Sequence, residues 1–137
     1  MSTEIDAVLR PEFRGYFEGL AAGTIQFPFC ASCERFHWYP LPLCPHCGGS
    51  SVEWRAVSGK GCLWSWTEVR HAYVPSLRER LPYFVALVTF EDAPGVRLLT
   101  NLVGHTQNLR IDMDVFPVFG EWSPGKPRVL FSTHRVG

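Results

Sequence analysis

The chain has 137 residues, of which 46% are hydrophobic and 19% charged, and its 13 basic and 13 acidic side chains give a formal net charge of zero. This composition excludes a disordered protein and leaves room for one ordinary domain or two very small ones. The charge balance supplies no general attraction to phosphate polymers or anionic membranes, so we expect no membrane partner. No apolar run approaches the roughly 20 residues of a membrane helix. The N-terminal residues lack the basic and apolar regions of a secretory signal, and we therefore expect a cytoplasmic protein.

The first expected element is a short helix over residues 10–22, within an N-terminal segment that we take as residues 1–24. Phe13, Phe17 and Leu20 recur at the spacing of one helical face. A helix this short is marginal in isolation, so it must pack against the rest of the chain or against a partner.

Residues 25–51 differ in character, because cysteine, proline and aromatic residues crowd together without a helical or strand period. Two Cys-x-x-Cys pairs dominate the segment: Cys30, Cys33, Cys44 and Cys47. Two such pairs can place four thiolates around one ion as a tetrahedron, which suits zinc. Four cysteines leave no open position for water, so we predict a structural site rather than a catalytic one. Iron in a rubredoxin-like site uses the same ligands, and the sequence leaves this alternative open.

Other residues in and near this segment have ordinary interpretations. His37 and His46 could substitute as metal ligands, but with four cysteines available we expect them to be packing or surface residues. A redox dithiol would need a βαβ setting, which the sequence lacks. Cys62 opens a later strand and is expected to be a small buried apolar residue. Trp38 and Tyr39 either pack against the rest of the chain or belong to a partner surface, and the sequence does not decide between these two.

From residue 52 onward the pattern is that of β-strands. Apolar, β-branched and aromatic runs occupy residues 61–69, 83–90, 96–103, 115–119 and 128–133. Five strands separated by turns rich in proline and glycine predict a small barrel. The segment 105–111, between the third and fourth strands, could hold a turn of helix. The strand 83–90 is apolar on both faces, so its outer face must be covered by the helix, the ribbon or another subunit.

The residue types of an active site do not converge anywhere in the sequence. We find no serine triad, no paired carboxylates and no glycine-rich phosphate loop, and we predict no catalytic residue in this chain. Arg70, Arg78 and Arg80 flank the long 70–82 loop. They are candidates for contacts with a partner or a phosphate, because arginine suits fixed contacts to carboxylate and phosphate groups.

An ordered series of motifs resembles a known family. The series runs through CASCERFHWYPLPLCPHCGG, then a strand ending in WTEV, then PYFVALV and RLLTNLVG. It is similar to the zinc-ribbon and OB-fold acyl-CoA-associated proteins, a family long catalogued as a domain of unknown function. The resemblance covers almost the whole chain.

The resemblance implies a mainly β fold, with an N-terminal helix, a rubredoxin-like zinc ribbon over residues 25–51 and a five-stranded OB-fold barrel over residues 52–137. It implies that the four cysteines are the zinc ligands and that no catalytic residue carries over. It further implies a non-catalytic accessory subunit that docks on a thiolase-superfamily enzyme (an acyltransferase or aldolase) or on an acyl-CoA hydratase. Such a subunit would contribute to CoA-thioester binding, for example in lipid or steroid side-chain metabolism.

An alternative function is a module that binds single-stranded nucleic acid, because OB-folds commonly do so. The zero net charge and the presence of only two lysines, Lys60 and Lys126, argue against it. The sequence also departs from the family at two turns, where Glu34 and Asp112 replace the usual glycine. We expect some strain at Glu34, whereas Asp112 tolerates a left-handed turn better than most residues do.

Overall fold

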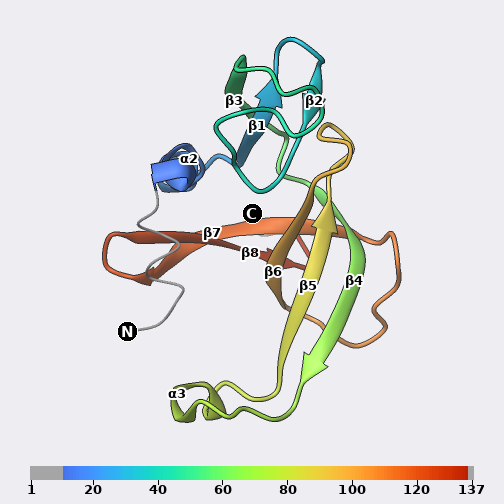
Figure 1. Cartoon of the computed structure of the whole chain (residues 1–137). Coiled ribbons are helices and arrows are strands. Elements are labelled where there is room, and N and C mark those ends of the chain that lie inside the picture. Colours follow the sequence, from blue (N-terminus) through green and yellow to red (C-terminus); the bar gives the residue numbers. More distant parts are fainter. Residues whose placement is uncertain (1–10, 136–137) are drawn as a thin grey trace.

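A three-stranded sheet and a five-stranded closed barrel make up most of the computed structural model, which describes residues 11–135 (Figure 1). This arrangement confirms the predicted fold class. The elements in chain order are η1 (Pro11–Phe13), α2 (Arg14–Ala21), β1 (Gln26–Cys30), β2 (Arg35–Phe36), β3 (Val52–Ala56), β4 (Gly61–Val69), α3 (Pro75–Arg78), β5 (Tyr83–Thr89), β6 (Arg97–Val103), β7 (Asp114–Ser123) and β8 (Lys126–Ser132).

The N-terminal helix consists of the 3-10 turn η1 followed by α2, and the first residue predicted for it, Arg10, lies outside the described residues. Two glycines explain how this segment ends and packs. Gly23 has a φ of 77°, and the N–H groups of Gly23 and Thr24 donate to the carbonyls of Leu20 and Gly19 at 3.0 and 2.8 Å. This pair of bonds is a Schellman motif, which needs a left-handed residue at the position of Gly23. At Gly15, a Cβ atom would lie 2.3 Å from Cε2 of Trp54, so only glycine admits the indole of β3 at this point.

The three-stranded sheet has the order β2-β1-β3, with both pairings antiparallel. β3 pairs with β1 along its whole length, from Gln26 opposite Ala56 to Cys30 opposite Val52. Residues 52–56 therefore belong to the ribbon sheet, whereas the sequence pattern grouped them with the barrel. The alternating pattern of this strand suits either sheet, and only its hydrogen-bonded partner decides between them.

The barrel has the strand order β4-β5-β6-β8-β7. Its neighbours are antiparallel except β6 and β8, which run parallel and pair only at Leu102 with Phe131 and at Val103 with Ser132. All five predicted barrel strands are present. The turn of helix predicted within 105–111 is wrong, because this stretch is an irregular loop in which Asn108 has a φ of 63°. A left-handed residue cannot continue a right-handed helix.

One hydrophobic core serves both the barrel and the N-terminal part of the chain. Leu63, Val88 and Phe131 fill the barrel, and Tyr16 from α2 and Phe27 from β1 join them. The ring of Phe27 lies 5.2 Å from the Phe90 ring, between centroids, and is fully buried. The ribbon and the barrel therefore pack as one unit through β1.

Candidate metal centre and partner-facing residues

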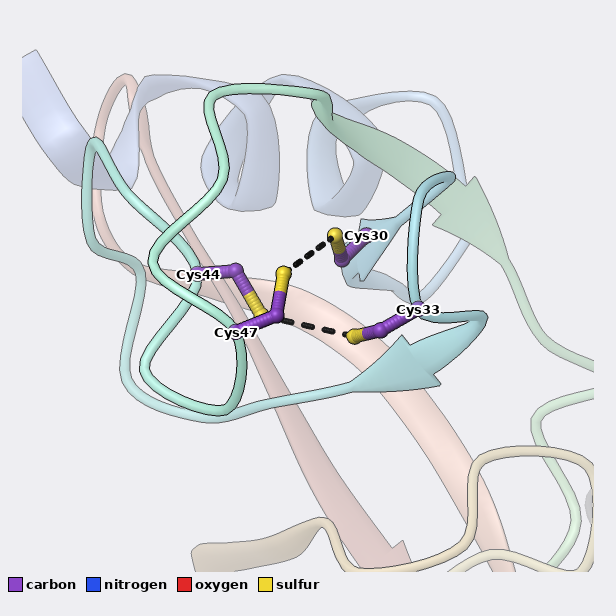
Figure 2. Close-up of side chains that lie close together, drawn as sticks. All are labelled: Cys30, Cys33, Cys44 and Cys47. Carbon is purple, nitrogen blue, oxygen red and sulfur yellow. Dashed lines mark hydrogen bonds between the residues drawn. The ribbon is translucent and has the colours of Figure 1, made fainter.

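The four predicted ligands lie together at the end of the ribbon sheet (Figure 2). Cys30 ends β1, Cys33 lies in the turn that follows it, and Cys44 and Cys47 lie in the loop between β2 and β3. Their Sγ atoms all lie within 4.8 Å of one another. The Sγ atoms of Cys30 and Cys47 lie 3.6 Å apart, and those of Cys33 and Cys44 lie 3.7 Å apart.

These distances suit a metal ion and not a disulfide. A disulfide requires a sulfur–sulfur distance of about 2.05 Å, and all four thiols are free. Four sulfurs at the corners of a tetrahedron, each about 2.3 Å from a zinc ion, would lie about 3.8 Å apart. The geometry of the four side chains therefore fits a tetrahedral zinc site with no position left for water.

The two Cys-x-x-Cys turns have the same backbone structure. The N–H of Glu34 donates to the carbonyl of Cys30 at 2.7 Å, and the N–H of Gly48 donates to that of Cys44 at 2.8 Å. Glu34 and Gly48 both have positive φ, at 58° and 74°. Glu34 thus occupies a glycine-like conformation, as expected from the sequence, and its side chain makes the first turn the more strained of the two.

Burial and the crowding of the four thiols oppose the ionisation of some of them while no cation is bound. The backbone N–H of Cys33 lowers the pKa of Cys30 to about 7, although burial opposes this shift. Burial raises the pKa of Cys33 to about 12, and hydrogen bonds from Cys44 and Cys30 add to the effect. A bound divalent ion would offset this cost, because it stabilises coordinated thiolates directly. The N–H groups of His46 and Gly49 also point at Sγ of Cys44 and Cys47, each at 3.4 Å, and would orient these two ligands.

The two ribbon histidines lie outside the ligand cluster. His46 is exposed, and its Nε2 atom lies 3.1 Å from the carbonyl oxygen of Phe36. His37 is buried, and neither ring nitrogen has a hydrogen-bond partner among the described residues. Burial lowers the pKa of His37, and the nearby His46 lowers it further. Within residues 11–135, the four cysteines are the one group of three or more side chains arranged to hold a metal ion.

Trp38 and Tyr39, whose role the sequence left open, have different environments. The Trp38 ring packs inward, with centroid distances of 4.8 Å to Tyr16 and 5.2 Å to Phe27. Tyr39 is 57% exposed. It lies near Leu41 and Leu43 in the sequence, and both of these leucines are also exposed. We call these three exposed residues the ribbon tip.

The three arginines around the 70–82 loop also differ. Arg70 forms a 2.7 Å ion pair with Glu68, and Nε of Arg78 donates to the carbonyl of Ala72 at 3.4 Å. Arg80 instead borders a groove of about 730 Å³ on the outside of the barrel. Arg128, on β8, lines the same groove. Arg128 is not among the candidates predicted from the sequence, because 47 residues separate it from Arg80 and no local motif marks it.

None of the helices in residues 11–135 has the length and apolar character needed to cross a membrane.

Comparison with known proteins gives two adjoining family matches. Residues 17–53 match the model described as "ChsH2, rubredoxin-like zinc ribbon domain", and residues 54–120 match "ChsH2, C-terminal OB-fold domain". The first model spans all four cysteines.

A curated relative from Pyrococcus furiosus, named "DUF35 domain-containing scaffold protein", is 43% identical over 67 residues. This match covers 47% of the chain and only 48% of the relative, so the chain accounts for about half of that protein's length.

Two solved structures are similar over most of the chain. The first, described as "Ltp2-ChsH2(DUF35) aldolase", has a TM-score of 0.79 and 29% identity, covering 90% of this chain and 95% of that one. The second is a protein of the DUF35 family from Sulfolobus solfataricus, described as having unknown function. It has a TM-score of 0.65 and 20% identity, covering 89% of this chain and 84% of that one. At this identity, the second match shows a shared fold only.

Proposed function

Since the chain belongs to the ChsH2 (DUF35) family of zinc-ribbon and OB-fold proteins, we propose that it is a non-catalytic accessory subunit of an acyl-CoA enzyme. The observation that carries this proposal is the similarity to the ChsH2(DUF35) chain of an aldolase assembly, which extends over 90% of the present chain. The scaffold name of the Pyrococcus furiosus relative supports the same role. The partner we propose is a thiolase-superfamily enzyme, either an acyltransferase or an aldolase, with an acyl-CoA hydratase as the alternative partner.

The candidate metal site supports an accessory role. A catalytic zinc keeps a position open for water or substrate, whereas the four thiols here suit a closed tetrahedral site. We propose that Cys30, Cys33, Cys44 and Cys47 hold one zinc ion, with iron as the alternative. The ion would cross-link the two Cys-x-x-Cys turns and so hold the ribbon in shape.

Interaction with CoA is a finer part of the proposal. The Arg80 and Arg128 side chains border an open groove whose lining is partly polar and partly apolar, and a guanidinium at the edge of an interface can contact a carboxylate of the partner or a phosphate of CoA. We propose that a CoA thioester bound to the partner passes close to this chain, while the reacting atoms stay on the partner.

Co-expression tests the accessory role. The chain is produced with the thiolase-superfamily enzyme encoded nearest to it in its own genome, and the mixture is analysed by size-exclusion chromatography with light scattering. We expect a stable complex, and an enzyme whose acyl-CoA activity falls when the chain is omitted. A chain that elutes alone and leaves the activity of the enzyme unchanged would refute the role.

A further inference from the structure

The outer face of the barrel carries an apolar band. Strand residues alternate between the two faces of a sheet, and the buried residues Ala86, Leu98, Leu102 and Val129 point into the barrel. Their strand neighbours must therefore point outward: Val85 and Leu87 on β5, Leu99 and Asn101 on β6, and Arg128 and Leu130 on β8. The register places these side chains next to one another, since Val85 lies opposite Asn101 and Leu87 opposite Leu99.

Neither α2 nor the ribbon covers the centre of this band. Leu99 is 56% exposed, although it lies in the middle of β6. Phe17 of α2 and Leu77 of α3 line the adjoining groove without closing it. Of the covers expected from the sequence for the outer face of residues 83–90, neither the helix nor the ribbon closes this face within residues 11–135, and Val85 and Leu87 stay half-buried. We call the surface formed by Val85, Leu87, Leu99, Asn101, Arg128 and Leu130 the barrel face.

Three arginines lie at the edge of the barrel face, and one of them, Arg128, belongs to it. Arg80 and Arg128 border the groove, and Arg97 begins β6 with its guanidinium 4.1 Å from the centre of the exposed Trp64 ring. Within residues 11–135, none of these three arginines lies within 4.0 Å of an acidic side chain. The face is therefore apolar in its middle and positively charged at its edge, although the chain as a whole carries no net charge.

We propose that the barrel face is the docking surface for the catalytic subunit, and that the matching surface of that subunit is apolar at its centre and acidic at its rim. This inference rests on the proposed function and names the surface that performs it. A second copy of this chain fits less well, because a two-fold interface brings the same patch of both copies together and would set arginines against arginines. Charge complementarity instead favours a different protein with carboxylates at the rim.

The experiment compares single substitutions in the complex with the neighbouring thiolase-superfamily enzyme, measured by isothermal titration calorimetry. We expect Leu99→Glu to weaken binding at least tenfold, because it would place a carboxylate in the apolar centre of the interface. Arg128→Glu should also weaken binding. The Arg128→Leu variant should bind with a smaller dependence on salt than the native chain, because rim charges act mainly through screened electrostatics.

A matched control separates docking from general damage. Ile111 is also 56% exposed, but it lies in the loop before β7 and lines neither the groove beside Arg80 and Arg128 nor the adjoining one. Ile111→Glu should bind as the native chain does. The Leu41→Glu variant tests the ribbon tip as the competing surface. Circular dichroism and thermal unfolding verify that each variant is folded.

Several outcomes would overturn the inference. A native complex that survives Leu99→Glu but is lost with Leu41→Glu would assign docking to the ribbon tip, while leaving the proposed function intact. Equal weakening by Leu99→Glu and Ile111→Glu would show no preference for the barrel face. Self-association of the native chain that Leu99→Glu abolishes would identify a second copy as the cover. The absence of any complex with the native chain would overturn the proposed function itself, and this inference with it.

Discussion

Truncation of Phe27 should destabilise the ribbon and the barrel together. The side chain comes from β1 of the ribbon sheet, yet it is fully buried in the common core, where its ring lies 5.2 Å from those of Trp38 and Phe90. A buried phenylalanine removes at least about 150 Å² from water, which is worth about 4 kcal/mol at roughly 25 cal/mol per Å². Measured phenylalanine-to-alanine costs in protein cores, about 3–5 kcal/mol, agree with this value. We therefore expect Phe27→Ala to raise the unfolding equilibrium constant by about three orders of magnitude.

The assay is equilibrium unfolding in urea with zinc present, followed by tryptophan fluorescence and by far-ultraviolet circular dichroism. Trp38 and Trp54 report on the ribbon side of the core and Trp64 and Trp66 on β4 of the barrel, whereas the dichroism reports on the backbone of both parts. Because both parts share one core, the two signals should change together in the native chain and in Phe27→Ala. Phe119→Ala is the control, since Phe119 is 37% exposed on β7, and it should cost about 1 kcal/mol or less. A cost below about 1.5 kcal/mol for Phe27→Ala, or two separate transitions in the native chain, would refute the single-core interpretation.

Three further predictions concern the metal, a close contact and a buried histidine. The chain should bind one zinc ion, and cobalt bound in place of zinc should give the absorption spectrum of a tetrahedral thiolate site. The Cys44→Ser variant should show a weaker cobalt spectrum, and an unchanged spectrum would contradict the ligand assignment. Gly15→Ala should lower the free energy of unfolding by roughly 1–3 kcal/mol, although alanine has the better helix propensity, because the new methyl group would overlap Trp54. Gly120→Ala is the control, since a Cβ atom at Gly120 would meet nothing within 4 Å. Because burial lowers the pKa of His37, the unfolded chain takes up this proton first as the pH falls. The contribution of neutral His37 to the free energy of unfolding should therefore be fully present above about pH 6.5 and should be lost as the pH falls below it. In denaturant unfolding measured at pH 5 and 7, the free energy of unfolding should fall less between the two pH values for His37→Phe than for the native chain. An equal fall in both proteins would argue against this role for the histidine.

The sequence predicted most of the local structure, because the signals for it are local. The two Cys-x-x-Cys pairs predict the four-thiol cluster, and the runs of apolar and β-branched residues predict the barrel strands to within a few residues. The left-handed turn at Asp112, with a φ of 68°, was also expected, because the residue stands where a glycine is usual.

Features that depend on contacts between distant parts of the chain could not be predicted from the sequence. The partner of β3 is β1, more than 20 residues earlier in the chain, and its own sequence carries no mark of that choice. Glycine is a poor helix former, and the sequence around Gly15 gives no sign that the Trp54 indole packs against it. The barrel face joins residues from β5, β6 and β8, whose proximity follows only from the closed strand order.

The single parallel seam of the barrel imposes an order on assembly during synthesis. The seam joins β6 to β8, and its last pair includes Ser132, so the ring of strands cannot close until Ser132 has left the ribosome. The ribbon needs much less of the chain, because its fourth cysteine is residue 47 and its last strand ends at Ala56. The ribbon can therefore capture its ion while the barrel is still an open sheet, and the nascent chain would present a metal-bound N-terminal unit on which the barrel strands later assemble.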